Sequence, residues 1–490
     1  MSTSAPTQEL HFVIGGAGFL GSYIARALVA RGETAVASFD LREPVERLKG
    51  VQYYTGDLTD RDSLARAIAL AHTETQSGGS EKRTAVIYHT ASPVAGLGPE
   101  VYEKVNVRGT ETVIAVAKEP AVRVGKLVFT SSAGVVFDGH NLNYVDERMP
   151  YPKKPLDSYN DTKVRVSHIR GRLTSQARAE KAVLEANDPS GLATVSLRPA
   201  GIFGPGDRQA LPGFFNVLST GRTKFQVGNN ENLFDWTYVE NVAHAHLLAA
   251  DRLPVHGAAG EQAEYVYEAS DLAVKHLPLR VLGEEERDLY RTVPISPRRQ
   301  DVPPPAKDYA RGLQIVGAAR LEDMPDLDVR PVFRNRFDQF FHHAHPGVAC
   351  GGNPMPDVHN FSQEKLGIAG EAFFITNGQP IAFWDFPRAL WYRYNGHVVP
   401  REQLWVIGLQ IALVLAFLAE CFSFLTRRPV QFTRYRVTYT ACARYYNIEK
   451  ARRLLSYEPL VGMDEAITRS VTWWKQLHPP ERPGESKKTQ

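Results

Sequence analysis

The chain has 490 residues, with 57 Lys or Arg and 54 Asp or Glu, so its formal net charge is +3. The length exceeds that of one nucleotide-binding domain and predicts a core with additions, while the near balance of charge gives no reason to expect nucleic acid as a partner. Three scattered cysteines, Cys350, Cys421 and Cys442, fit a reducing compartment and argue against a disulfide framework or a zinc site.

The first predicted elements, within residues 11–32, are a strand, a tight glycine turn and a helix. HFVI has β-type character, GGAGFLG follows it, and SYIARALVARG places apolar residues at helical spacing. The glycines let the backbone turn sharply and let a pyrophosphate approach the helix N-terminus, where unpaired N–H groups favour an anion. The residues expected to line a dinucleotide here are Gly15, Gly18, Phe19, Leu20 and Gly21.

The next predicted strand, residues 33–39, ends in Asp40. An acidic residue about 20 positions past the glycines usually binds the ribose hydroxyls of the adenosine, so the context favours a dinucleotide over a glycine-rich turn without a ligand. Asp40 suits NAD, because a carboxylate repels a 2′-phosphate. Arg42 lies two residues further on and leaves NADP open.

Strands and helices then alternate, which predicts an α/β fold of the Rossmann type with a doubly wound parallel sheet. Strands are expected at 51–57, 84–92 and 126–130, the last running into a loop that begins at Ser131, and helices at 60–72 and 100–119. Ligands of such sheets lie at the carboxyl ends of the strands. The residues expected there are Asp40, Asp57, Leu58, Ala91, Ser131 and Ser132.

The sequence DSYNDTK places Lys163 four residues after Tyr159. On a helix these two side chains share a face, and the ammonium lowers the pKa of the phenol from its usual value of about 10. The phenolate can then take a proton from an alcohol while hydride leaves its carbon, and a serine hydroxyl holds the substrate oxygen. The alternative is a surface Tyr–Lys pair, which the serines at a strand end upstream make less attractive.

The chain resembles the extended short-chain dehydrogenases/reductases, and more narrowly the 3β-hydroxysteroid dehydrogenase group. The motifs that carry the resemblance are GGAGFLG (15–21), YHTASP (88–93), NVRGT (106–110), FTSSAGVVFDG (129–139), YNDTK (159–163) and LRPAGIFGPGD (197–207). Two further stretches, 371–386 and 432–467, look like the fungal sterol-4α-carboxylate 3-dehydrogenases (decarboxylating). The family pattern has Thr before the first glycine, where this chain has Ile14.

The resemblance implies a role for each matching residue. Tyr159 would be the acid/base, Lys163 would tune it and bind the nicotinamide ribose, and Asn106 would order a proton relay. Ser132 would bind the substrate, with Ser131 as the alternative. Oxidation of a 3β-alcohol beside a 4-carboxylate gives a β-keto acid, which loses CO2 readily, so no metal site is required. The implied partners are a sterol and the other enzymes of C-4 demethylation, and a homodimer is left open.

Residues 164–176, VRVSHIRGRLTSQ, interrupt the helix that should continue from Tyr159 and Lys163. The segment has no acidic residue and contains Gly171, and its removal would join YNDTK to ARAEKAVLEAN as one helix. We therefore expect an insertion here, such as a translated intron. Further on, His244 and His246 are interpreted as helix residues and not as metal ligands.

Segment 253–369 is rich in Pro and charge and is expected to be largely irregular. Its histidines, with Cys350, fit no standard metal site. Residues 404–426 are apolar almost throughout and long enough to cross a bilayer. We favour a monotopic membrane contact, in which the helix lies on the bilayer without crossing it, because the family-like stretch that follows the helix belongs on the same side as the soluble domain. A buried core helix is the alternative.

The expected organisation ends in a smaller C-terminal substrate part and a tail. The predicted segments are 1–252 (NAD-binding core and start of the substrate part), 253–369 (excursion), 370–403 (return to the substrate domain), 404–426 (membrane-contact helix), 427–476 (substrate-domain helices) and 477–490 (disordered tail). The N-terminus shows no basic stretch followed by an apolar run, so no cleavable signal is expected. The expected location is the endoplasmic reticulum membrane, with the catalytic domain facing the cytosol.

Three hypotheses about the function of the chain remain. The favoured one is a sterol-4α-carboxylate dehydrogenase that uses NAD. A plain 3β-hydroxysteroid dehydrogenase or a sugar-nucleotide epimerase is the rival among enzymes, and the apolar stretch argues against the epimerase. A catalytically dead NAD-binding scaffold is the rival outside enzymes, and the insertion after Lys163 keeps that reading open.

Overall fold

The structure is a computed structural model of the chain. It describes residues 5–75, 83–94, 97–145, 147, 149, 151–152, 175–188, 190–254, 368–397, 399–400, 403–427, 430 and 432–479, with the backbone of 279–281 and 332–334. Tyr159, Lys163, the histidines at 342, 343 and 345, the tail from 480 and most of the predicted insertion lie outside the described residues.

A seven-stranded sheet forms the centre of the larger part, and every pair of neighbouring strands is parallel. The strand order is β14-β7-β5-β4-β1-β2-β3, so the chain changes direction across the sheet between β1 and β4. This confirms the predicted doubly wound sheet and puts its topological switch point at the end of β1. The strands are β1 (Leu10–Ile14), β2 (Val36–Asp40), β3 (Val51–Thr55), β4 (Ala85–His89), β5 (Val124–Thr130), β7 (Ala193–Pro199) and β14 (Glu371–Ile375).

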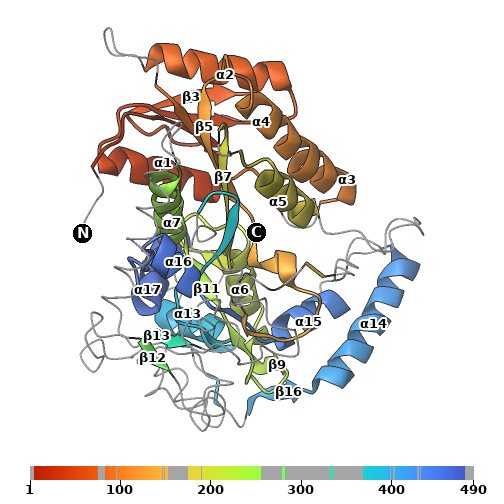
Figure 1. The fold of residues 1–490 in the computed structure, drawn as a ribbon. Coiled ribbons are helices and arrows are strands. Elements are labelled where there is room, and N and C mark those ends of the chain that lie inside the picture. The colour runs from red at the N-terminus through yellow and green to blue at the C-terminus, as the bar shows by residue number, and fades with distance from the viewer. Residues whose placement is uncertain are drawn as a thin grey trace.

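Helices cover both faces of this sheet (Figure 1). On one face α1 (Phe19–Arg31) packs beside α7 (Val239–Arg252), and on the other lie α2 (Arg61–Glu74), α4 (Gly109–Ala117) and α5 (Ser175–Glu185). Consecutive residues of β1 alternate between the two cores: Val13 packs with the first set of helices, and Phe12 and Ile14 with the second. The two-residue period of a strand thus buries both faces, which explains the nearly continuous apolar runs.

The predicted helix over 100–119 contains a π-helical turn. α3 (Pro99–Tyr102) continues as η1 (Glu103–Arg108), a π-helix, and then as α4. Asn106 lies in the π-helical turn and is buried. Such turns are often found at functional sites because they redirect a side chain out of the regular helical pattern.

An aromatic core holds the smaller part together. Trp236 stacks on Phe386 with ring centroids 4.2 Å apart, and Phe215 stacks on Trp474 at 4.4 Å. The elements that contribute to this core are β8 (Gly201–Phe203), α6 (Ala210–Ser219), β10 (Leu233–Phe234), β11 (Trp236–Tyr238), β15 (Ile381–Ala382), α13 (Asp385–Asn395) and α17 (Met463–Leu477). Buried residues of β6 (Leu142–Val145), β17 (Arg444–Tyr446) and α16 (Glu449–Leu454) pack instead with the core of the main sheet beside α1 and α7. A four-stranded sheet of order β15-β10-β17-β6 joins residues that are far apart in sequence.

The end of the long excursion returns to the main sheet. β14 lies beside β7 at the sheet edge, with Glu371 opposite Val195. Within segment 253–369 the described backbone of β12 (Leu279–Val281) pairs in parallel with that of β13 (Val332–Arg334). Sequence patterning did not predict the pairing of β14 with β7 or that of β12 with β13, because the two strands of each pair are short and far apart in the chain.

The apolar stretch near the C-terminus begins later as a helix than the sequence predicted. Trp405–Ile407 form strand β16, paired with β9 (Phe225–Val227), and the helix α14 runs from Leu409 to Thr426. β9 follows the short 3-10 turn η3 (Arg222–Lys224), and α15 (Arg434–Ala441) packs against α14.

A buried ion pair fixes α5 to the main sheet. Arg198 of β7 makes hydrogen bonds to both carboxylate oxygens of Glu180, the shortest at 2.7 Å, and both residues are buried. Ser196 and Tyr151 also donate to this carboxylate, at 2.9 and 2.5 Å. Burial raises the pKa of Glu180, but the charge of Arg198 and these hydrogen bonds outweigh it and hold the pKa below its ordinary value.

We expect Glu180→Gln to lower the free energy of unfolding by about 3–5 kcal/mol, because it removes the main opposing charge from the buried guanidinium of Arg198. Urea unfolding followed by tryptophan fluorescence measures this change. The matched control is Glu185→Gln on the same helix, where the carboxylate is 66% exposed, and a change below about 1 kcal/mol is expected.

The same pair gives a pH dependence of known sign. Since the pKa of Glu180 is lower in the folded chain, its contribution is present above the ordinary Glu pKa and is lost as the pH falls through the folded value. The difference between wild type and Glu180→Gln should therefore shrink in acid. A difference that stays constant from neutral to acidic pH would contradict the ionised pair.

Candidate active site

The glycine turn at the end of β1 brings three segments into close backbone contact. Gly15 has a positive φ of 84°, and a Cβ there would lie 2.8 Å from the backbone nitrogen of Ala91. A Cβ on Gly21 would lie 2.2 Å from the carbonyl oxygen of Gly15. Gly18 is the N-cap of α1 and has no side chain to cap it. The helix N-terminus is therefore available to an anion, and the residues fit a dinucleotide pyrophosphate.

Asp40 lies directly beside this turn. One carboxylate oxygen accepts the backbone N–H of Ala17 at 3.1 Å, and the other accepts the N–H of Arg42 at 3.4 Å. A carboxylate at the end of the second strand, next to the glycines, fits ribose hydroxyls that donate hydrogen bonds. Its negative charge opposes a phosphate on the same ribose.

The loop after β3 places Asp57 against η1. Lys104 donates to its carboxylate at 2.8 Å, and the N–H and hydroxyl of Thr59 donate to it at 2.9 and 2.8 Å. Lys104 is the main cause of a lowered pKa at Asp57. The neighbouring Leu58 packs against Gly109. A Cβ added to Gly109 would lie 2.2 Å from Cδ1 of Leu58. Asp40 thus ends β2, Asp57 follows β3 and Ala91 follows β4, so all three lie at carboxyl ends of strands, as the sequence predicted.

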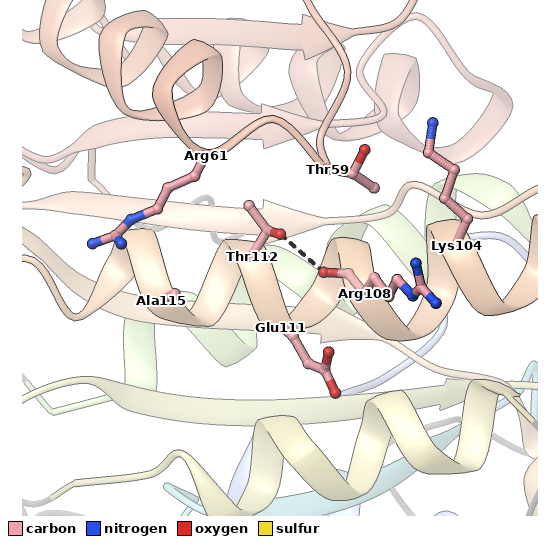
Figure 2. A pocket seen from close by; sticks show the side chains of 7 residues that line it. All are labelled: Thr59, Arg61, Lys104, Arg108, Glu111, Thr112 and Ala115. Atoms are coloured by element: carbon pink, nitrogen blue, oxygen red, sulfur yellow. Dashed lines mark hydrogen bonds between the residues drawn. The ribbon is translucent and has the colours of Figure 1, made fainter.

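A shallow hollow of about 600 Å³ adjoins Asp57 through Lys104 (Figure 2). Figure 2 shows that η1 and α4 supply most of its side chains, with Thr59 and Arg61 coming from the loop after β3 and the start of α2. The lining residues are Thr59, Arg61, Lys104, Arg108, Glu111, Thr112 and Ala115. The ammonium of Lys104 is bound to Asp57, and Arg61 is paired with Glu119, so two of its three cations already have partners.

The serine pair lies between the end of β5 at Thr130 and the short 3-10 turn η2 (Ala133–Val136). Ser132 is the N-cap of η2 and accepts the N–H of Gly134 at 3.1 Å, while its side chain stays partly exposed. Ser131 is buried, and its hydroxyl lies near the carboxylate of Glu180. The geometry therefore favours Ser132 over Ser131 as the hydroxyl that a substrate can reach.

Asn106 and the start of α5 lie next to each other. The side-chain amide of Asn106 donates to the hydroxyl of Ser175 at 3.1 Å, and its oxygen accepts from Ser92 at 3.4 Å. The neighbouring Gln176 donates to the carbonyl oxygen of Thr130, at 3.0 Å, just before the serine pair. The first turn of α5 is therefore held between η1 and the serine turn.

His246 supports the serine turn from the opposite face of the sheet. Burial lowers its pKa to about 4, so the imidazole is neutral at physiological pH. One ring nitrogen lies 2.7 Å from the carbonyl of Val242, and the other lies 2.7 Å from the hydroxyl of Thr130. The arrangement assigns the ring proton to the first contact and makes the second nitrogen an acceptor. His244 and His246 both lie on α7, as interpreted from the sequence.

Sequence reasoning missed Thr130, Gln176 and His246 as supports of the serine turn. His246 carried a signal, because it falls on the same helical face as Val239, Val242 and Ala250. Thr130 and Gln176 carried none, since their contacts join residues that the sequence separates. Tyr159 and Lys163 lie outside the described residues, so their positions relative to Ser132 and Asn106 stay a prediction.

Comparisons with known proteins extend these observations. Residues 12–275 match the model of the 3-beta hydroxysteroid dehydrogenase/isomerase family. The chain is 33% identical to the decarboxylating sterol-4-alpha-carboxylate 3-dehydrogenase of Schizosaccharomyces pombe, over 94% of this chain and 95% of that one. It is 31% identical to the Saccharomyces cerevisiae enzyme of the same name, over 94% of this chain and 96% of that one.

A solved structure shares the fold at low sequence identity. The dTDP-glucose 4,6-dehydratase of Bacillus anthracis, in complex with NAD, superimposes with a TM-score of 0.50 at 13% identity, over 96% of this chain and 97% of that one. Because the family match covers more than half of the chain and the relatives match it from end to end, the resemblance noted in the sequence motifs is confirmed. This chain belongs to the 3-beta hydroxysteroid dehydrogenase/isomerase family.

Proposed function

We propose that this chain oxidises the 3β-hydroxyl of a 4α-carboxysterol to the ketone, with loss of the carboxylate as CO2, in the C-4 demethylation of sterol biosynthesis. The observation that carries the proposal is the near full-length match to two fungal enzymes whose names state this reaction. The glycine turn, with Asp40 beside it, supports an oxidation that uses a nicotinamide dinucleotide.

NAD is the proposed cofactor. The glycine turn leaves room for the pyrophosphate at the N-terminus of α1, and Asp40 accepts hydrogen bonds where the adenosine ribose would lie. A bound NAD would supply the acceptor for the hydride that leaves C3 of the sterol. The residues proposed to hold the dinucleotide are Gly15, Gly18, Phe19, Leu20, Gly21, Asp40, Asp57, Leu58, Ala91, Tyr159 and Lys163.

The proposed chemistry assigns one role to each residue of the site. Ser132 binds the substrate oxygen, and the phenolate of Tyr159 takes the hydroxyl proton as the C3–H bond breaks. Lys163 stabilises the phenolate, and Asn106 orders the relay that returns the proton to solvent. In the resulting β-keto acid the C4–carboxyl bond breaks heterolytically, CO2 leaves, and the electron pair forms an enolate with the new ketone. The enolate then takes a proton from water at C4, which gives the 3-ketone, and the step requires no metal.

The proposed setting is the cytosolic side of the endoplasmic reticulum membrane, together with the other enzymes of C-4 demethylation, and a homodimer is compatible with it. The water-insoluble substrate and the apolar helix α14 support a membrane setting.

A catalytically dead NAD-binding scaffold is the second candidate function. The observation that favours it is that Gln176 holds the position beside the serine turn that Lys163 would take if residues 164–176 were removed. Gln176, in the first turn of α5, donates to the carbonyl of Thr130 beside the serine turn. Deletion of residues 164–176 joins Lys163 directly to Ala177, which puts the lysine at the chain position that Gln176 now holds. Tyr159 then lies one helical turn earlier. The shortened chain should therefore present the Tyr–Lys pair to Ser132 and Asn106.

Turnover of the proposed substrate tests the reaction and the role of Tyr159. NADH formation with a 4α-carboxysterol in detergent should be measured for wild type, for the deletion of 164–176, and for Tyr159→Phe in both backgrounds. We expect Tyr159→Phe to lower kcat by about 100-fold or more in whichever background is active, because the proton acceptor is lost. Activity confined to the deletion would show that the segment silences a sound site. Silence in every form, with NAD still bound, would favour the scaffold.

The preference between NAD and NADP tests the role of Asp40. Asp40→Asn removes the charge that repels a 2′-phosphate, so the ratio of kcat/KM for NADP over that for NAD should rise about tenfold or more. The matched control is Asp62→Asn in the first turn of α2, which should leave the ratio unchanged. An unchanged ratio in Asp40→Asn would mean that this carboxylate does not face the ribose.

A further inference from the structure

The helix α14 lies at the periphery of the molecule (Figure 1). Most of its apolar side chains are exposed. Among the described residues it is the one helix long and apolar enough to cross a membrane, with a mean hydropathy of 2.0 over 18 residues, and only 11% of that window is buried. The exposed apolar side chains on it are Leu409, Ile411, Val414, Leu415, Phe417, Leu418, Phe422, Phe424 and Leu425. A surface of this kind on a folded chain marks a contact with a partner or a bilayer.

The opposite side of α14 is packed against the protein. Ala412 and Ala416 are fully buried and pack with Val227 of β9 and Val437 of α15. One turn further along, Glu420 accepts the backbone N–H of Arg434 at 2.8 Å and its guanidinium at 2.7 Å. The small residues let α15 approach closely, so the helix has a protein face and an apolar outer face.

Both ends of α14 are tied to the same soluble part. Before it, β16 pairs with β9, and after it, α15 leads into β17 of the four-stranded sheet. A helix of this length is about 27 Å long, so a span would need its ends on opposite sides of a hydrocarbon core about 30 Å thick. A span would also draw Arg434 and the other polar residues of α15 into the hydrocarbon. The packing of both flanking segments therefore favours a helix whose two ends lie on the same side of the bilayer over a span.

An aromatic pair extends the apolar surface beyond the start of the helix. Trp405 and Phe225, which are opposite each other on β16 and β9, have ring centroids 5.8 Å apart. They are 67% and 48% exposed, although both are large and apolar. Trp is enriched at the boundary between headgroups and acyl chains, where its ring is partly solvated.

Cations flank the apolar surface at both ends. Arg222 and Lys224 of η3 are exposed immediately before Phe225, and Arg427 is exposed immediately after α14. Glu420 is the acidic residue within α14, and Arg434 neutralises it. The margin of the surface is therefore positive, which complements anionic lipid headgroups.

We propose that α14, with Trp405 and Phe225, seats this chain flat on a bilayer that contains anionic lipid, with both ends of the helix on the same side. The outer face enters the acyl region, and the cations at its margin contact headgroup phosphates. This seat deepens the proposed function, because a sterol dissolved in the bilayer would reach the substrate part without crossing water.

Flotation of the full chain with vesicles, without any sterol, tests the seat. Vesicles of phosphatidylcholine alone are compared with vesicles that also contain phosphatidylserine. We expect more binding to the anionic vesicles, and a loss of about tenfold or more in Leu418→Glu/Phe422→Glu. Arg222→Gln/Lys224→Gln should lose the preference for anionic vesicles. The matched control is Leu70→Glu on α2, an exposed leucine of the larger part, which should bind as wild type does.

A membrane-impermeant maleimide tests the flat orientation. Gln403→Cys and Thr426→Cys are made separately in a chain whose Cys350, Cys421 and Cys442 are replaced by Ser, and each is synthesised in the presence of sealed microsomes. Labelling of both positions without detergent is the expected result. Labelling of one position alone would show a span and would overturn the proposal.

Other outcomes also decide the matter. If the wild-type chain does not float with vesicles, the proposed membrane seat is wrong. If it binds equally to both vesicle types, the proposed preference for anionic lipid is wrong. If the wild-type chain does not bind vesicles but sediments as a dimer, and Leu418→Glu/Phe422→Glu is a monomer, the apolar surface of α14 contacts a second copy of the chain and not a bilayer. Because flotation needs no substrate, a failure of the proposed reaction leaves this result unchanged, and a failure of the seat leaves the dehydrogenase assay unchanged.

Discussion

The close backbone contact between Gly21 and the carbonyl of Gly15 is the constraint on which the nucleotide-binding part depends. It sets the angle between β1 and α1, and it fixes where α1 begins and therefore where the unpaired backbone N–H groups of its first turn lie. The same turn lies against the backbone of Ala91 after β4, and the hydroxyl of Thr90 donates to the carbonyl of Ile14 at 2.9 Å, so the switch point of the sheet is tightly closed. A side chain on Gly21 would collide with the carbonyl of Gly15 and push α1 away from the end of β1.

The sequence was sufficient for the parts of the molecule in which local pattern and fold agree. The glycine turn, the alternation of strands and helices and Asp40 at the end of β2 follow from short-range patterns, so the doubly wound sheet was predictable. The serine pair at the end of β5 was also predictable, because a buried strand ends there. The family motifs added residue roles that no spacing rule supplies.

Other features depend on contacts between distant residues and were not predictable. The π-helical turn around Asn106 gave no periodic signal, and the amide of Gln176 reaches Thr130 across 46 positions. β16 was hidden inside an apolar run that continues into α14, since hydropathy alone does not separate a short strand from the helix that follows. The buried pair of Glu180 and Arg198 is a similar case, because each residue alone reads as a surface charge.

The position of β14 has a consequence for how the chain folds. Its partner β7 comprises residues 193–199, whereas β14 comprises residues 371–375. During synthesis at roughly 5–20 residues per second, the edge of β7 stays without its neighbour for on the order of ten seconds or more. An apolar parallel edge left open for that time is a template for pairing with other chains. The growing polypeptide therefore has a window in which a chaperone that covers this edge would raise the yield of the folded protein.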